Sequence, residues 1–265
     1  MANKGKYYES QFEKATIELL CEAHWQYAFG DDIHRKYTDP FIEEDLRNFL
    51  AAQYKDKNLT TSEMDSIVAN LRNTGGQNDY YALRNAFLLY RDGYDFAYSD
   101  GRYNPFRLEY IDFEHPDHNV FRCVNQFVME QGRENRRPDI LLFINGIPVC
   151  IIELKNPTKQ NATIRDAHTQ ICMRYMRDIP ALLKYCALAV ISDGAKNALG
   201  TTYTPFEFFY EWKKIENEDT AGKGLDTLRT LIRGALSPER ILEILRDYVY
   251  FPDPTKEDDT TDLVC

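Results

Sequence analysis

Two apolar runs joined by the dipeptide Asn145–Gly146 constrain the fold of this chain more than any other feature. The stretch RPDILLFINGIPVCIIELKNP spans residues 137–157, and its runs 140–144 and 147–152 have the length and composition of buried strands. Asp139 directly precedes the first run, and Glu153 and Lys155 directly follow the second. Because desolvating a charge is costly, charged residues at the end of a buried hairpin indicate a specific role.

The spacing of Glu153 and Lys155 suggests a site for hydrolytic chemistry. Residues i and i+2 of a strand project from the same face, so the two side chains are expected to lie together. A carboxylate binds a hard cation such as Mg²⁺, and a lysine stabilises negative charge on a phosphate. Asp139 is the candidate for the second carboxylate. The alternative for the triplet alone is an exposed ion pair at a strand end.

The register of the hairpin decides whether these carboxylates meet. Asn-Gly favours a two-residue type I′ turn, which in a regular hairpin would place Asp139 opposite Ile152. Glu153 would then point to the other side of the sheet. A three-residue loop or a single bulge places Asp139 opposite Glu153, and Pro148 could sit at such an irregularity because it cannot donate to the ladder. The metal-site hypothesis therefore requires an irregular hairpin.

The order of expected elements favours an α/β fold with a mixed central sheet flanked by helices and an added N-terminal helical region. Helical periodicity or caps are present at 8–23, at 39–54 with Asp39 as N-cap, at 60–76 with a Thr60/Glu63 capping box, and at 79–93. Strands are expected from about 107, at 186–194, and at 204–212, with helices at 163–179, 226–236 and 237–251. This divides the chain into a helical region 1–106 packing on the core, a core 107–251 with closing helices, and an acidic linker 252–265.

Composition limits the partners and the location. A net charge of −10 counts against a surface that coats DNA generally, although Arg133, Arg136 and Arg137 lie just before Asp139. Lys159 and Arg165 follow Lys155, and these basic residues either line a site or form a solvated face. No apolar run reaches the length of a membrane span, and no signal peptide is apparent. The cysteines, of which several lie in apolar runs, favour a reducing cytoplasm.

The hairpin motif resembles that of the PD-(D/E)-x-K nucleases, and most of all the N-terminal nuclease domain of the restriction (R) subunit of type I restriction–modification enzymes. YESQFEKATIELL, NVFRCVNQFVME and the segment 178–212 resemble other parts of that domain. The resemblance implies a restriction-endonuclease-like core that cleaves double-stranded DNA with Mg²⁺. Asp139, Glu153 and Lys155 match the catalytic motif, with Asp139 and Glu153 as metal ligands. Glu13 on the opening helix is the choice for a further catalytic acid, with Glu9 one turn earlier as its alternative.

One feature departs from the pattern of that family, which usually carries Gln-x-x-x-Tyr on the helix after the lysine. Here Gln170 and Tyr175 are five residues apart, a spacing that does not align on an α-helix, whereas Gln170 and Arg174 do align. Gln170, Arg174, Arg137 and Arg136 are therefore candidates for DNA contact or site orientation, and the role of Tyr175 stays open between that and a core aromatic. No His or Cys cluster has the spacing of a zinc site.

The resemblance also implies a larger assembly. An ATP-driven motor would follow residue 265, and modification and specificity subunits would select the DNA. This stretch has no P-loop, so ATP is a cofactor for the absent motor region alone. Two alternatives remain open: a catalytically silent DNA-holding or subunit-docking module with the same fold, and a nuclease that acts on RNA or single strands.

Overall fold

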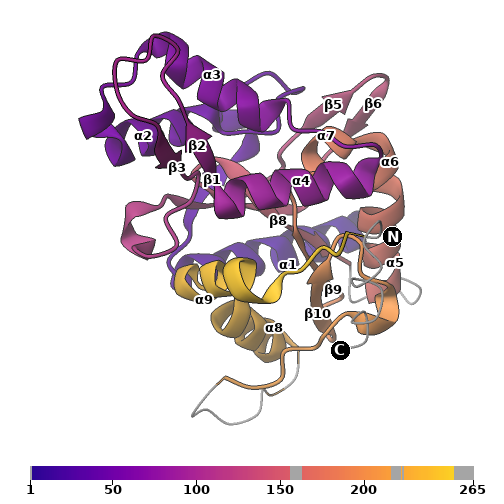
Figure 1. Ribbon diagram of the computed structural model, residues 1–265. Coiled ribbons are helices and arrows are strands. Elements are labelled where there is room, and N and C mark those ends of the chain that lie inside the picture. The colour runs from indigo at the N-terminus through magenta and orange to yellow at the C-terminus, as the bar shows by residue number, and fades with distance from the viewer. Residues whose placement is uncertain (1, 156–162, 216–221, 223, 254–265) are drawn as a thin grey trace.

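A six-stranded mixed sheet forms the centre of the computed structural model, which describes residues 2–155, 163–215, 222 and 224–253, without the side chains of 2–9 (Figure 1). The sheet order is β1 (Gln26–Phe29), β4 (Phe121–Asn125), β7 (Ile140–Ile144), β8 (Ile147–Leu154), β9 (Leu188–Ser192) and β10 (Asn197–Thr201). The β1–β4 and β8–β9 pairs are parallel, and the other three pairs are antiparallel. Two small hairpins lie apart from it, β2 (Tyr94–Phe96) with β3 (Phe106–Leu108) and β5 (Met129–Gln131) with β6 (Glu134–Arg136).

The helices come before, within and after the strands along the chain. Those before β2 are α1 (Ala2–Glu22), α2 (Glu43–Gln53), α3 (Thr61–Arg72) and α4 (Asp79–Asp92), with β1 between the first two. Between β8 and β9 lie α5 (Ile164–Thr169), a π-helical turn (Gln170–Tyr175), α6 (Met176–Asp178) and α7 (Pro180–Leu183). The last are α8 (Leu225–Leu231) and α9 (Pro238–Glu243), each continued by a π-helical turn, Ile232–Leu236 and Ile244–Tyr248. Short 3₁₀ turns occupy Gly30–Asp32, Lys55–Lys57, Pro116–His118 and Phe206–Phe208.

Two hydrophobic cores cover the two faces of the sheet. Alternate residues of β7, namely Ile140, Leu142 and Ile144, pack into a core with α1–α4, α8 and α9. Leu141 and Phe143 pack into a second core with α5–α7 and the π-helical turn between them. Every residue of β7 and β8 is buried for this reason, which is why both read as apolar runs.

The structure differs from the sequence expectations in three local places. Helix α2 begins at Glu43 rather than at Pro40, because the Asp39 carboxylate accepts the N–H of Phe41 in a local turn instead of capping the helix. The segment 204–212 contains the 3₁₀ turn Phe206–Phe208 and a single bridge from Tyr210 to Leu199, while β10, the edge strand, lies just before it. Strand β1 joins the other edge from within the region that reads as helical.

Other expected features are confirmed. Thr60 and Glu63 form the capping box of α3, and Gly93, with a φ of 68°, ends α4. Among the described residues, no helix is long and apolar enough to cross a membrane.

Candidate active site

The β7–β8 hairpin contains the irregularity that the metal-site hypothesis requires. Ile144 pairs with Ile147 across the turn, where Asn145 and Gly146 have φ angles of 50° and 75°. The register then shifts between Leu142 and Phe143, so that Leu142 pairs with Cys150 and Val149 is the extra residue. A two-residue turn and a bulge thus occur together, next to Pro148 as expected.

The bulge determines which face Glu153 occupies. Val149 and Cys150 are consecutive yet both enter the core on the α1–α4 side, so the alternation of β8 changes phase there. Ile151 packs on the opposite side with α5–α7, and by alternation Glu153 projects to that side too. Asp139 precedes β7 on the same face, since Leu141 also packs there. Beyond the bulge Ile140 pairs with Ile152, which places Asp139 opposite Glu153.

Glu153 is buried at the centre of this site. Its side chain is 2% exposed, and its Oε1 accepts a hydrogen bond from the Lys155 ammonium at 2.8 Å. Its Oε2 is buried and accepts no hydrogen bond of normal geometry within the described part of the chain, although the Tyr175 hydroxyl lies near enough to the carboxyl to lower its pKa. Burial, reinforced by the negative charge of Asp139, raises the pKa of Glu153 to about 8 against the attraction of Lys155. The two carboxylates are therefore close enough to affect each other.

A short polar chain connects Lys155 to the helix that covers this face. The Lys155 ammonium donates to Gln170 Oε1 at 2.7 Å, and Gln170 Nε2 donates to the Tyr175 hydroxyl at 2.6 Å. Burial and the neighbouring Glu153 charge raise the pKa of Tyr175 above its usual value. Glu153, Lys155, Gln170 and Tyr175 thus form one cluster.

The π-helical turn Gln170–Tyr175 corrects the spacing argument. In a π-helix the backbone hydrogen bonds run from i to i+5, so each turn holds more residues than in an α-helix, and here Gln170 and Tyr175 come within hydrogen-bond distance. Tyr175 is 3% exposed, whereas Arg174 is exposed, and a DNA contact by Arg174 stays a prediction. A single inserted residue in the helix therefore brings this glutamine and tyrosine together despite their spacing.

The other basic candidates differ in their exposure and in their interaction partners. Arg137 is exposed, two residues before Asp139. Arg136 donates to Asp178 of α6 at 2.7 Å and also pairs with Glu134, so it holds the β5–β6 hairpin against the helix. Lys159 lies outside the described residues, and Arg165 stacks over the Phe206 ring. A DNA contact by Arg137 stays a prediction that its exposure permits.

Glu13 lies at the neighbouring strand end. Its carboxylate accepts hydrogen bonds from the side-chain amides of Asn125 at 2.6 Å and Gln126 at 3.0 Å. Asn125 ends β4 and pairs with Ile140, the residue after Asp139. Glu13 therefore lies near the same strand ends of the sheet as Asp139. Its carboxylate is already bound by the two side-chain amides. The side chain of Glu9 lies outside the part that the structure describes.

The donor set fits a hard divalent cation. Asp139 and Glu153 supply carboxylate oxygens, the ligands that Mg²⁺ prefers, and the buried Oε2 of Glu153 accepts no hydrogen bond of normal geometry in the described part of the chain. Asp139 is held in place because its Oδ2 accepts the backbone N–H of Leu154 at 2.7 Å. A cation beside Glu153 would favour its charged form, which burial alone opposes.

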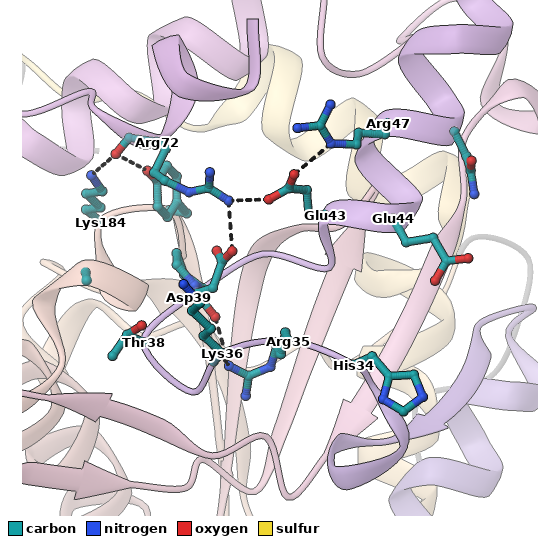
Figure 2. Close-up of a pocket in the computed structure, with 14 residues that line it drawn as sticks. His34, Arg35, Lys36, Thr38, Asp39, Glu43, Glu44, Arg47, Arg72 and Lys184 are labelled. Atoms are coloured by element: carbon teal, nitrogen blue, oxygen red, sulfur yellow. Dashed lines mark hydrogen bonds and ion pairs between the residues drawn. The ribbon is translucent and has the colours of Figure 1, made fainter. Parts of the chain in front are cut away.

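A separate polar cavity of about 840 Å³ lies beside α2 and α3 and has a structural explanation. Arg72 bridges Asp39 at 2.8 Å and Glu43 at 2.7 Å, and Arg47 pairs with Glu43 in turn (Figure 2). Lys184 donates to the backbone carbonyl of Arg72. These ion pairs hold the loop before α2 against α3, which gives the paired charges a structural role, while the lining as a whole carries five basic and three acidic side chains.

Comparison with known proteins shows the family. The family described as "Type I restriction enzyme R protein N terminus" matches residues 6–208. The chain is 28% identical over 254 residues to the type I restriction enzyme HindI endonuclease subunit of Haemophilus influenzae, covering 92% of this chain and 24% of that protein. It is also 28% identical over 261 residues to a putative type I restriction enzyme MjaIXP endonuclease subunit of Methanocaldococcus jannaschii, covering 89% and 25%. The chain thus spans about a quarter of the length of these relatives, and it belongs to the family of type I restriction enzyme R protein N-terminal regions.

Proposed function

We propose that this chain is the endonuclease domain of a type I restriction subunit, a PD-(D/E)-x-K nuclease that cleaves double-stranded DNA with Mg²⁺. The observation that carries the proposal is the position of Glu153: nearly fully buried, opposite Asp139, paired with Lys155, and with one oxygen that accepts no hydrogen bond of normal geometry in the described chain. A purely structural role does not account for a buried carboxyl whose pKa is raised to about 8.

The residues of the site have distinct roles in this proposal. Asp139 and Glu153 would hold Mg²⁺, which when bound supplies charge neutralisation at the phosphate and activation of water. Lys155, with its ammonium fixed between Glu153 and Gln170, stabilises the negative charge of the scissile phosphate. Gln170, itself oriented by the Tyr175 hydroxyl, keeps Lys155 at that position. Arg137 is the candidate for contact with the DNA backbone.

Delivery of the DNA is assigned to the rest of the complex. A net charge of −10 opposes approach to a polyanion, and few basic side chains surround the site. We infer that a motor region and the modification and specificity subunits hold the DNA at high local concentration beside this domain. ATP would be used by that motor alone.

The test is DNA cleavage by the full-length restriction subunit assembled with its partners, carrying Asp139→Asn. Asparagine keeps an oxygen that accepts the Leu154 N–H but removes the charge, so the protein should fold while Mg²⁺-dependent cleavage falls at least 100-fold. Asp95→Asn, a change at a 77% exposed carboxylate on β2, is the control and should cut normally.

The alternative functions predict other outcomes. A silent docking module predicts that Asp139→Asn and the parent complex cut DNA equally, which would refute the catalytic role of this site. Preferential cleavage of RNA or single strands in the same assay would refute the assignment to double-stranded DNA.

A further inference from the structure

A group of three possible metal ligands is linked to the turn end of the β7–β8 hairpin, the end away from the candidate active site. Asp112, His115 and His118 follow one another at intervals of three residues, in the loop between β3 and β4 that contains the 3₁₀ turn Pro116–His118. One ligand atom from each lies within 4.8 Å of the others. The spacing of histidines and cysteines alone gives no sign of this group, because its third member is an aspartate.

The distances suit a small cation. Asp112 Oδ2 lies 2.9 Å from His118 Nδ1 and 3.4 Å from His115 Nδ1. Ligand atoms about 2.0–2.2 Å from a tetrahedral zinc ion are separated by roughly 3.3 Å. Both aspartate–histidine distances are close to that value, and all three atoms lie within 4.8 Å of one another. The side chains of His115 and His118 are 64% and 49% exposed, so a metal in solution has access to the site.

The aspartate is oriented as metal-binding carboxylates are. Its Oδ1 accepts the backbone N–H groups of Glu114 and His115, which fixes the carboxylate plane and leaves Oδ2 turned toward the two imidazoles. Gln53 also donates to Oδ2, at 3.1 Å. Asp112 is only 5% exposed, and hydrogen bonds that include the His115 N–H and the His118 ring lower its pKa despite burial. Such surrounding hydrogen bonds raise the metal affinity of a ligand set by holding it in position.

The two imidazole rings are close and nearly parallel. Their centroids lie 4.8 Å apart with an interplanar angle of 24°. A divalent ion held by the two rings and the Asp112 carboxylate would use atoms that the loop already places side by side.

The cluster is joined to the hairpin that carries the candidate active site. Asn119, at the end of the same loop, accepts the N–H of Asp112 at 2.9 Å and the side-chain amide of Asn145 at 2.8 Å. Asn145 is the first turn residue between β7 and β8. The loop therefore holds the turn at one end of the hairpin while Asp139 and Glu153 lie at the other.

We propose that Asp112, His115 and His118 form a structural zinc site that stabilises the turn of the β7–β8 hairpin. Asp112 Oδ2, His115 Nδ1 and His118 Nδ1 are the protein ligands, and solvent completes the tetrahedron. Each imidazole would bind through Nδ1 as the neutral tautomer that carries its proton on Nε2, so no further reactant is needed. This site is independent of the proposed nuclease centre.

The experiment is a calorimetric titration of the metal-free 265-residue chain with ZnCl₂, in parallel with thermal unfolding. We expect one zinc ion per chain and a rise of several degrees in Tm with excess zinc, because the ion binds the folded loop. The double variant His115→Gln/His118→Gln keeps hydrogen-bond donors for Asp112 but removes the imidazole ligands. It should fold, bind zinc at least 100-fold more weakly and show no zinc-dependent rise in Tm.

Three further variants separate this site from other metal-binding groups. His34→Ala, at an exposed histidine in another loop, and Cys21→Ser, at an exposed thiol, should both leave zinc affinity unchanged. Glu153→Gln should also leave it unchanged, so that failure of the nuclease proposal and failure of this one are distinguishable. Full zinc affinity in the double histidine variant, loss of affinity in Glu153→Gln, or no saturable binding by the parent chain would overturn the proposal.

Discussion

Replacement of Glu153 by glutamine should stabilise the metal-free protein more and more as the pH rises from 5 to 8. Burial, together with the charge of Asp139, raises the pKa of Glu153 from 4.5 to about 8. Between these two values the folded protein keeps a proton that the unfolded chain has released. The folded state of the parent protein therefore loses stability as the pH rises through this window, whereas glutamine does not titrate.

The size of the effect follows from the shift. One pKa unit corresponds to about 1.4 kcal/mol, so the full shift corresponds to about 5 kcal/mol, and about 3 kcal/mol is lost between pH 4.5 and pH 7. Glutamine also alters the hydrogen bond that the Lys155 ammonium donates to Glu153, which changes the stability of the variant by an amount that does not depend on the titration of residue 153. The quantity to measure is therefore how the difference in unfolding free energy between the parent and Glu153→Gln changes with pH, rather than its value at one pH.

Urea unfolding at pH 5, 6, 7 and 8 in EDTA measures this difference, since titrations common to both proteins cancel. Glu18→Gln, at a 63% exposed glutamate of α1, is the matched control and should differ from the parent by under about 0.5 kcal/mol at every pH. Added Mg²⁺ should flatten the pH dependence of the parent protein alone, because the cation binds the deprotonated carboxylate. A difference between the parent and Glu153→Gln that is constant from pH 5 to pH 8 would refute the reasoning.

Three other predictions follow from the site. Tyr175→Phe removes the hydroxyl that orients Gln170, so it should slow cleavage by the assembled enzyme roughly 10–100-fold and change stability by about 1 kcal/mol. Arg174→Ala should leave both the cleavage rate and the stability unchanged. Equal effects of the two substitutions would contradict the contact between Gln170 and Tyr175 in the π-helical turn. Deletion of Val149 removes the bulge and should abolish cleavage, because Glu153 would turn to the other face of the sheet. Val149→Ala should lower the stability of the folded protein by about 2 kcal/mol and leave cleavage intact. An active deletion variant would show that the hairpin register does not position the site. The isolated chain should bind duplex DNA at physiological salt with a Kd of roughly 10⁻⁴ M or weaker and cut it poorly, so tight, salt-resistant binding in a titration would reveal a DNA-capture surface of its own.

Local sequence determined the parts of this protein whose interactions are short in range. The turn at Asn145–Gly146 has positive φ angles at both residues, which asparagine and glycine tolerate best. A Cβ at Gly146 would also lie 2.1 Å from the carbonyl oxygen of Ile42, so the glycine is required by packing as well. The capping box of α3 forms between residues three apart. In each case the neighbours in sequence are also the partners in space.

Sequence also showed that the hairpin must be irregular if its charges are to form a site, but only the tertiary structure decided where the irregularity lies. A bulge can occur at several places in an apolar strand, and packing between two cores selected Val149. The contact between Gln170 and Tyr175 was likewise hidden, because spacing arguments assume an α-helix and the helix has a π turn here. The extra residue of the π turn is accommodated where the turn packs on the sheet and Gln170 accepts a hydrogen bond from Lys155.

The strand β1 and the cluster of Asp112, His115 and His118 depend on long-range or mixed interactions. β1 is four residues long and half exposed, so its pairing with β4 left no periodic signal in the sequence. The metal-ligand cluster arises because Asn119 and Asn145 fold one loop against a turn about 26 residues away. The sequence thus predicted which residues would carry the chemistry, while the faces on which they meet were decided by how the helices and strands pack.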